Sequence, residues 1–159
     1  MSIQIYTDGA AKGNPGNGGY GALLRFKGKE KEFSQGYRET TNNRMELLAV
    51  IVALEALTTS KYSVTIYSDS KYVVDSVEKG WVFNWEKKGF KNKKNVDLWK
   101  RYLPLHRKFN PAFIWVKGHA GHAENERCDQ LAVRAAESND LLIDQGFENR
   151  STEDEPGLF

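Results

Sequence analysis

The sequence predicts an α/β fold in which a five-stranded mixed sheet is flanked by helices. Three observations predict it. The first segments alternate apolar and polar residues, a long stretch then repeats apolar residues at helical spacing, and short β-rich segments afterwards alternate with helix-like ones. This order is typical of a mixed sheet, and we expect three antiparallel strands followed by two parallel additions.

The first part of the chain has the pattern of an antiparallel meander. Residues 2–8 alternate with a period of two, which predicts a strand that ends at Asp8. Residues 9–19 contain five glycines and a proline, so we expect a tight loop there. Two further strands, joined by a turn, are expected at residues 20–27 and 31–38.

The rest of the chain alternates helices with strands. A helix opens after Asn43, because leucine and isoleucine recur every three or four residues as far as the cluster at residues 58–60. The elements expected after it are a strand at 62–67, a helix at 70–78, an irregular basic and aromatic segment at 80–96, a helix at 97–108, a strand at 112–116 and a helix at 124–136.

Length and composition indicate one domain. We expect it to span residues 1–148, followed by an acidic, disordered tail at 149–159. The single cysteine, Cys128, excludes an internal disulfide bond and favours a reducing, cytoplasmic setting. No apolar run approaches the roughly 18 residues of a membrane span, and the N-terminus does not resemble a signal peptide.

Charge is distributed unevenly around a net value of +2. Residues 79–108 contain ten lysines and arginines against two acids, whereas residues 137–159 contain seven acids against Arg150. A basic segment of this kind favours a polyanionic partner, although a solvated helix face would have the same composition.

Four acidic residues occupy positions where a site is expected to form. Asp8 and Asp69 each end a predicted strand, and neighbouring parallel strands bring such ends together. Glu46 and Asp129 lie early in predicted helices. If the four carboxylates converged, they would repel one another, and hard divalent cations such as Mg²⁺ would remove that repulsion.

Each acid also has a structural explanation. Asp8 begins an Asp-Gly dipeptide that is common in turns, and Glu46 stands three residues after Asn43, as in a capping box. Asp69 fits a helix N-cap, and Asp129 fits an exposed helical acid. The spacing of the four acids leaves both interpretations open.

Five ordered blocks over residues 3–137 resemble the bacterial ribonuclease HI family. The blocks are Tyr6-Thr7-Asp8-Gly9 with Gly13-Asn14-Pro15-Gly16 and Gly18-Gly19-Tyr20-Gly21; Thr40-Thr41-Asn42-Asn43-Arg44-Met45-Glu46-Leu47; Ser68-Asp69-Ser70 with Tyr72-Val73; Gly80-Trp81 with Asn84-Trp85; and Trp115-Val116-Lys117-Gly118-His119-Ala120-Gly121-His122 with Glu124-Asn125-Glu126-Arg127-Cys128-Asp129. The last block is a very specific match.

The resemblance implies an endonuclease that hydrolyses the RNA strand of RNA–DNA hybrids with little dependence on sequence, leaving 5′-phosphate and 3′-hydroxyl ends. It implies a two-metal-ion mechanism with two Mg²⁺ ions, Mn²⁺ being an alternative, held by Asp8, Glu46, Asp69 and Asp129. It also assigns a catalytic role to His119, in proton transfer or product release; a histidine in a glycine-flanked loop suits that role, because imidazole ordinarily exchanges protons near neutral pH.

The resemblance also implies a set of substrate contacts. Asn14, Asn42 and Asn43 match minor-groove contacts, and Thr41 and Asn95 match a pocket for a DNA phosphate. Trp81 and Trp85 match an aromatic channel for the DNA sugars, although they also fit helix packing. The basic protrusion, which would bind phosphates, consists of Lys87, Lys88, Lys91, Lys93 and Lys94.

Two features depart from the family pattern. Lys71 stands where close relatives often have Gln, and the basic protrusion is a few residues shorter between Phe90 and Asn95. We expect a monomer, with the tail at 149–159 offering a contact to a replication or repair protein. Another nuclease of this fold, a catalytically silent hybrid-binding module and a domain of a polymerase are the alternatives.

Overall fold

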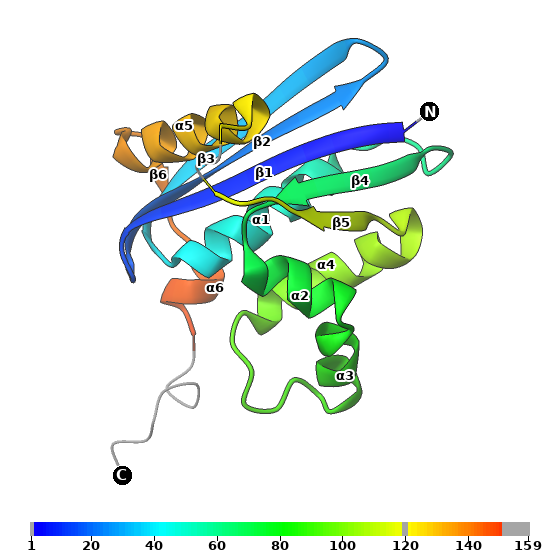
Figure 1. Cartoon of the computed structure of the whole chain (residues 1–159). Coiled ribbons are helices and arrows are strands. Elements are labelled where there is room, and N and C mark those ends of the chain that lie inside the picture. Colours follow the sequence, from blue (N-terminus) through cyan, green and yellow to red (C-terminus); the bar gives the residue numbers. More distant parts are fainter. Residues whose placement is uncertain (1, 119–120, 151–159) are drawn as a thin grey trace.

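The computed structural model describes residues 2–118 and 121–150, and its centre is a six-stranded sheet in the order β5-β4-β1-β2-β3-β6 (Figure 1). The strands are β1 (Ser2–Gly13), β2 (Gly16–Phe26), β3 (Lys29–Thr40), β4 (Ser63–Ser68), β5 (Ala112–Trp115) and β6 (Leu141–Leu142). The helices are α1 (Asn42–Glu55), α2 (Lys71–Glu78), α3 (Trp81–Lys87), α4 (Val96–Phe109), α5 (Ala123–Glu137) and α6 (Gln145–Glu148).

The predicted fold class is confirmed. Strands β1, β2 and β3 form the antiparallel meander, β4 pairs in parallel with β1, and β5 pairs in parallel with β4. The sheet has one strand more than expected, because the two-residue β6 pairs in parallel with β3 at Gly36 and Tyr37. Helix α5 packs on β1, β2 and β3, while α1 and α4 lie on the opposite face of the sheet (Figure 1).

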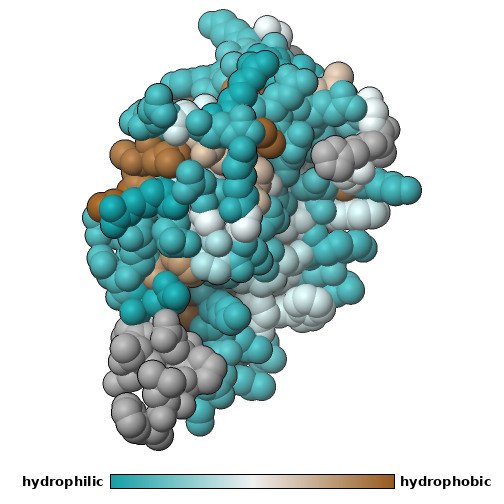
Figure 2. All heavy atoms as spheres, turned by 90° about the vertical axis from the view of Figure 1, so that its left-hand side faces the viewer, coloured by the Kyte–Doolittle hydropathy of each residue, from teal (hydrophilic) through white to brown (hydrophobic). Residues whose placement is uncertain are grey.

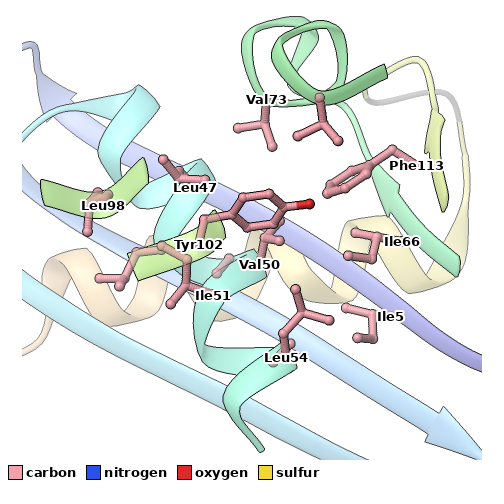
Figure 3. Close-up of a cluster of buried hydrophobic side chains, with 14 of the residues drawn as sticks. Ile5, Leu47, Val50, Ile51, Leu54, Ile66, Val73, Leu98, Tyr102 and Phe113 are labelled. Carbon is pink, nitrogen blue, oxygen red and sulfur yellow. The ribbon is translucent and has the colours of Figure 1, made fainter. Parts of the chain in front are cut away.

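The main core fills the space between the sheet and helices α1, α2 and α4. Alternate residues of β1, including Ile3 and Ile5, point into it, as their period of two requires. Helix α1 is buried on nearly all sides, so its apolar residues are not confined to one stripe. Figure 3 shows side chains of α1 and the sheet gathered around Tyr102 of α4.

The predicted loop at residues 9–19 is wrong. Strand β1 continues to Gly13 and β2 begins at Gly16, so most of these glycines lie inside strands. Gly19, and Gly21 just after this segment, allow close approach of α5: a Cβ at Gly19 would lie 2.6 Å from the backbone oxygen of Ala132, and one at Gly21 only 2.3 Å from that of Cys128. Glycine therefore lets α5 pack directly on the backbone of β2.

The predicted irregular segment at residues 80–96 contains a helix, α3. It begins after Gly80, which has a φ of 76°, and its Phe83 packs 4.9 Å from the His106 ring of α4. Glu86 of α3 also forms an ion pair with Arg107. Contacts with a neighbouring helix, which local sequence does not reveal, thus order this segment.

The surface is largely hydrophilic on the face seen in Figure 2. In the part of the chain that the structure describes, no helix is long and apolar enough to cross a membrane. Cys128 is fully buried, and burial raises the pKa of its thiol to about 12. The tail predicted at 149–159 lies outside the described residues from 151 onward.

Candidate active site

Asp8 and Asp69 lie side by side because of the register between β1 and β4. Thr7 of β1 is paired in parallel with Ser68 of β4. Asp8 is the next residue of β1, and Asp69 directly follows the end of β4, so the two aspartates are neighbours. The chain turns into α2 immediately after Asp69, with Ser70 as the N-cap that accepts a hydrogen bond from the Val73 amide. The N-cap of α2 is therefore Ser70, and the interpretation of Asp69 as a helix N-cap is wrong.

Glu46 reaches the same place from helix α1. Its Oε1 accepts a hydrogen bond from the backbone amide of Gly9, directly after Asp8. A Cβ at Gly9 would lie 2.4 Å from the Glu46 backbone nitrogen, so only glycine allows α1 this close to β1. The capping-box interpretation is wrong: the N-cap is Thr41, whose hydroxyl accepts from the Arg44 amide at 3.3 Å.

The three acids form a compact cluster of carboxylates. One carboxylate oxygen from each of Asp8, Glu46 and Asp69 lies within 4.8 Å of the others. They line a cleft of about 440 Å³, which Asp129 of α5 also lines. The structure thus brings all four predicted acids to one cleft, with three in a tight group and the fourth beside them.

The electrostatics of the cluster favour a bound cation. Asp8 and Glu46 are only 8% and 3% exposed. Burial, together with the nearby charge of Asp69, raises the pKa of Asp8 to about 7. Burial, and then the carboxylate of Asp8, raises the pKa of Glu46 well above its ordinary value. A hard divalent ion with oxygen ligands would offset this mutual repulsion.

A smaller pocket adjoins the cleft and contains a residue that the sequence reasoning missed. Asn125 of α5 lines it together with Asp8, Asp69 and Asp129. Among the described residues, its Nδ2 is buried without a hydrogen-bond partner, so the pocket offers an unused donor. A single asparagine in a charged helix gives no sequence signal of this kind. The predicted catalytic His119 lies outside the described residues.

The predicted groove-binding asparagines lie together at the cleft. Asn42 and Asn43 line it at the start of α1. The Oδ1 of Asn14, in the turn between β1 and β2, accepts a hydrogen bond from the Asn42 amide at 3.1 Å. The turn and the helix are thereby joined at one edge of the cleft.

Thr41 and Asn95, the predicted phosphate pocket, are linked through Arg44. The Thr41 hydroxyl accepts from the Arg44 backbone amide, and Asn95 Oδ1 accepts from Arg44 Nη1 at 3.5 Å. Asn95 has a φ of 62° and donates from Nδ2 to the Tyr72 hydroxyl at 3.1 Å. The two residues therefore belong to one hydrogen-bonded unit.

Arg44 is a further residue that the sequence reasoning missed. It is buried and donates to Asp97 of α4 and to Asp144 just before α6. Burial disfavours its charge, but these hydrogen bonds outweigh that cost and raise the pKa of Arg44. The sequence does contain a signal for this pair: an arginine at the start of an apolar helix is expected to be buried, and a buried charge requires acidic partners.

The two predicted channel tryptophans differ in their surroundings. Trp81 is 44% exposed, whereas Trp85 packs edge-on against the buried Trp99, with ring centroids 6.1 Å apart. Trp85 thus fits the helix-packing interpretation as well as the channel, and Lys93 Nζ lies 5.2 Å from its ring centroid. The exposed lysines of the basic protrusion follow both tryptophans along α3 and the segment after it: Lys87, Lys88, Lys91, Lys93 and Lys94.

Comparison with known proteins gives close relatives over most of the chain. The family model described as RNase H matches residues 1–137. A ribonuclease H of Rippkaea orientalis is 52% identical over 156 residues, covering 95% of each chain. A ribonuclease H of Desulforamulus reducens is 57% identical over 147 residues, covering 89% of this chain and 92% of the relative.

Solved structures are similar over the same region. LC9-RNase H1, described as a type 1 RNase H with the type 2 active-site motif, matches with a TM-score of 0.74 and 30% identity, covering 96% of this chain and 82% of that chain. LC11-RNase H1 in complex with an RNA/DNA hybrid matches with a TM-score of 0.64 and 26% identity, covering 86% and 97%.

Proposed function

The chain belongs to the ribonuclease H family, and from that premise we propose that it hydrolyses phosphodiester bonds in the RNA strand of RNA–DNA hybrids. The observation that carries the proposal is the cluster of Asp8, Glu46 and Asp69, which lies in an open polar cleft with Asp129 at its side. The structural neighbour LC11-RNase H1 was solved with an RNA/DNA hybrid, which supports this substrate.

The donor set of the cleft fits divalent metal ions. Carboxylate oxygens at this spacing suit Mg²⁺, which prefers oxygen ligands and keeps several of its waters. We propose that two Mg²⁺ ions bind, with Asp8 and Asp69 as the central ligands and Glu46 and Asp129 completing the two sites. Such ions supply activation of a water and stabilisation of the leaving oxygen, which gives 5′-phosphate and 3′-hydroxyl ends.

The protein's own contribution is to hold these ligands in place. The Gly9 amide fixes the Glu46 carboxylate, and the Ser70 cap fixes the chain just after Asp69. The unpartnered amide of Asn125 gives a donor for an anionic oxygen in the adjoining pocket. We assign the predicted proton transfer or product release to His119.

Substrate selection then comes from the surfaces on either side of the cleft. Amide side chains of Asn14, Asn42 and Asn43 suit the minor groove, where 2′-hydroxyls identify RNA. The Thr41–Asn95 unit would hold a DNA phosphate, and Trp81 and Trp85 would follow the DNA sugars. Because the basic protrusion binds phosphates, cleavage should depend little on sequence and strongly on salt.

A panel of matched duplexes tests this function. The protein is incubated with Mg²⁺ and with labelled RNA–DNA, RNA–RNA and DNA–DNA duplexes of one sequence, and the cut strand and its end groups are identified. We expect cleavage of the RNA strand in the hybrid alone. Preferential loss of a DNA strand would instead indicate another nuclease of this fold.

Matched substitutions separate the metal ligands from other acids. Asp8→Asn and Asp69→Asn should each lower the rate by at least about a thousandfold, whereas hybrid binding stays largely intact. Asp140→Asn, at an exposed acid outside the cleft, is the control and should cut normally. Full activity of Asp8→Asn would contradict the ligand assignment.

A further inference from the structure

A lysine lies at the edge of the carboxylate cleft, at the first residue of α2. Lys71 lines the cleft, and its Nζ lies 4.3 Å from the centroid of the Trp115 ring. That distance is typical of a cation–π contact. Trp115 donates from Nε1 to the backbone oxygen of Asp69 at 3.1 Å, and β5 pairs it with Ser68. The indole ring therefore places the ammonium group relative to the acids.

The Lys71 ammonium is not held in a salt bridge with the neighbouring acids in the described part of the chain. Over residues 2–118 and 121–150, no ion pair joins Lys71 to a carboxylate, although Asp69 is its neighbour in sequence and Asp8 lines the same cleft. The side chain is exposed. Its positive charge is thus directed to the ring and the solvent at the cleft edge, where it remains available to an incoming anion.

We propose that Lys71, held on Trp115, binds a phosphate of the RNA strand next to the bond that is cut. The proposal rests on the proposed function. Four carboxylates and two divalent ions have formal charges that cancel, so a bound phosphodiester adds one negative charge to the cleft. Among the described residues that line the cleft, Lys71 has the positive charge that offsets it.

Lys71 differs in this respect from the lysines of the basic protrusion. Those lysines lie on α3 and the segment after it and can bind phosphates away from the acids, whereas Lys71 follows Asp69 directly. Its contact should therefore position the strand that reacts. Lys71 is a substrate-positioning residue, and its effect should appear both in hybrid affinity and in its dependence on salt.

The test compares charge with packing at this position. Lys71→Met keeps the length of the side chain without its charge, and Lys71→Arg keeps the charge. Lys61→Met is the control, because Lys61 is exposed and precedes β4, at the end of that strand opposite Asp69. Hybrid affinity is measured from about 50 to 300 mM salt in the Asp8→Asn background, which keeps the duplex intact. KM and kcat are measured in the otherwise unchanged protein.

We expect Lys71→Met to raise the KM for the hybrid about fivefold at 0.1 M salt. The logarithm of the association constant for the hybrid falls as the logarithm of the salt concentration rises, and we expect Lys71→Met to make that slope less steep by about 1. Lys71→Arg and Lys61→Met should keep the original slope. In a protein that already carries Trp115→Leu, Lys71→Met should cause a smaller change in KM and in the salt slope, because the ring that holds the ammonium group in place is absent.

Three results would overturn the proposal. An unchanged slope with unchanged KM would show that Lys71 only packs on Trp115. A higher KM with an unchanged salt slope would indicate that Lys71 contacts sugars or bases of the hybrid and not a phosphate. A change confined to the Mg²⁺ concentration needed for activity would indicate an effect on metal binding. Failure of the proposed function would appear separately, as no RNA-strand cleavage of hybrids by the unsubstituted protein.

Discussion

Arg44 of α1 and Asp144, just before α6, form a buried bidentate ion pair, with Nε–Oδ2 and Nη2–Oδ1 distances of 2.8 and 2.9 Å. Asp144 also accepts a hydrogen bond from the Thr40 hydroxyl at 2.7 Å. It thereby joins the end of β3, helix α1 and the C-terminal helix. Both side chains are buried, and Arg44 also donates to Asp97, so loss of Arg44 would leave Asp144 without a cationic partner, whereas loss of Asp144 would leave Arg44 with half of its acidic contacts.

Replacing Asp144 tests this network. Asp144→Ala should lower the free energy of unfolding by about 2 kcal/mol or more, because it leaves Arg44 with Asp97 as its remaining acidic partner, leaves the buried Nε without an acceptor and removes the N-cap of α6. Urea unfolding measures the change. Asp140→Ala, at an exposed acid nearby in sequence, should change it by less than about 0.5 kcal/mol. Equal effects of the two substitutions would contradict the role of the network.

The contact between α5 and β2 gives a second prediction. Gly21→Ala should destabilise the protein by about 2 kcal/mol or more, because the new Cβ would collide with the Cys128 backbone oxygen. Thermal unfolding followed by circular dichroism gives the measurement. Ser34→Ala serves as the control, since Ser34 is paired with Gly21 across the sheet but is exposed. A fully stable Gly21→Ala protein would show that α5 can shift away at little cost.

The cluster of acids predicts how stability depends on pH when no metal is present. Asp8 loses its proton near pH 4 in the unfolded chain but near 7 in the folded one, so the folded state binds that proton more tightly. The stability from this group is fully present below pH 4 and is lost as the pH rises through 7. Asp8→Asn should therefore become more stable than the unsubstituted protein by at least about 1 kcal/mol at pH 8.

Denaturant unfolding in a chelator at several pH values measures this difference. It should be small near pH 4 and grow between pH 4 and 7, and added Mg²⁺ should reduce it because the ion offsets the same repulsion. Asp140→Asn should show no such trend. A difference between Asp8→Asn and the unsubstituted protein that is independent of pH would rule out the raised pKa as its cause.

The two tryptophans of α3 should respond differently to removal. Trp81→Ala should leave stability nearly unchanged, because Trp81 is exposed, but should weaken hybrid binding about fivefold if the ring contacts the DNA strand. Trp85→Ala should lower stability by about 2 kcal/mol, because Trp85 packs against Trp99. Parallel binding and unfolding measurements separate the effects. Loss of stability in Trp81→Ala with unchanged binding would reverse this assignment.

Much of the fold was predictable from local patterns. Strands β4 and β5 and helices α1, α2, α4 and α5 lie within a few residues of their predicted positions. Helices α2, α4 and α5 repeat apolar residues along one face, and α1 is a long apolar segment between a polar start and the cluster at residues 58–60. The glycines of β1 and β2 misled the prediction, since a glycine needed for a turn and one needed for close helix contact look alike in sequence. Helix α3 and the short β6 depend on contacts with distant elements, which no local pattern shows.

The site was predictable only in part for a similar reason. Strand-end placement indicated that Asp8 and Asp69 meet, and the register between β1 and β4 explains why. Local rules suggested a capping role for Glu46, but its carboxylate accepts from Gly9, 37 residues earlier in the chain. The Arg44–Asp144 pair and the unpartnered Asn125 amide depend on three-dimensional packing that sequence spacing does not contain.

The parallel pairing of β1 with β4 also makes the site sensitive to misfolding. Side chains alternate between the faces of a strand, so a slip of one residue would move Asp8 to the face opposite Asp69. A chain trapped in that slipped arrangement would keep nearly all of its secondary structure, yet it would lack the paired carboxylates. Recovery of enzymatic activity during refolding would therefore report correct strand alignment, which circular dichroism alone would miss.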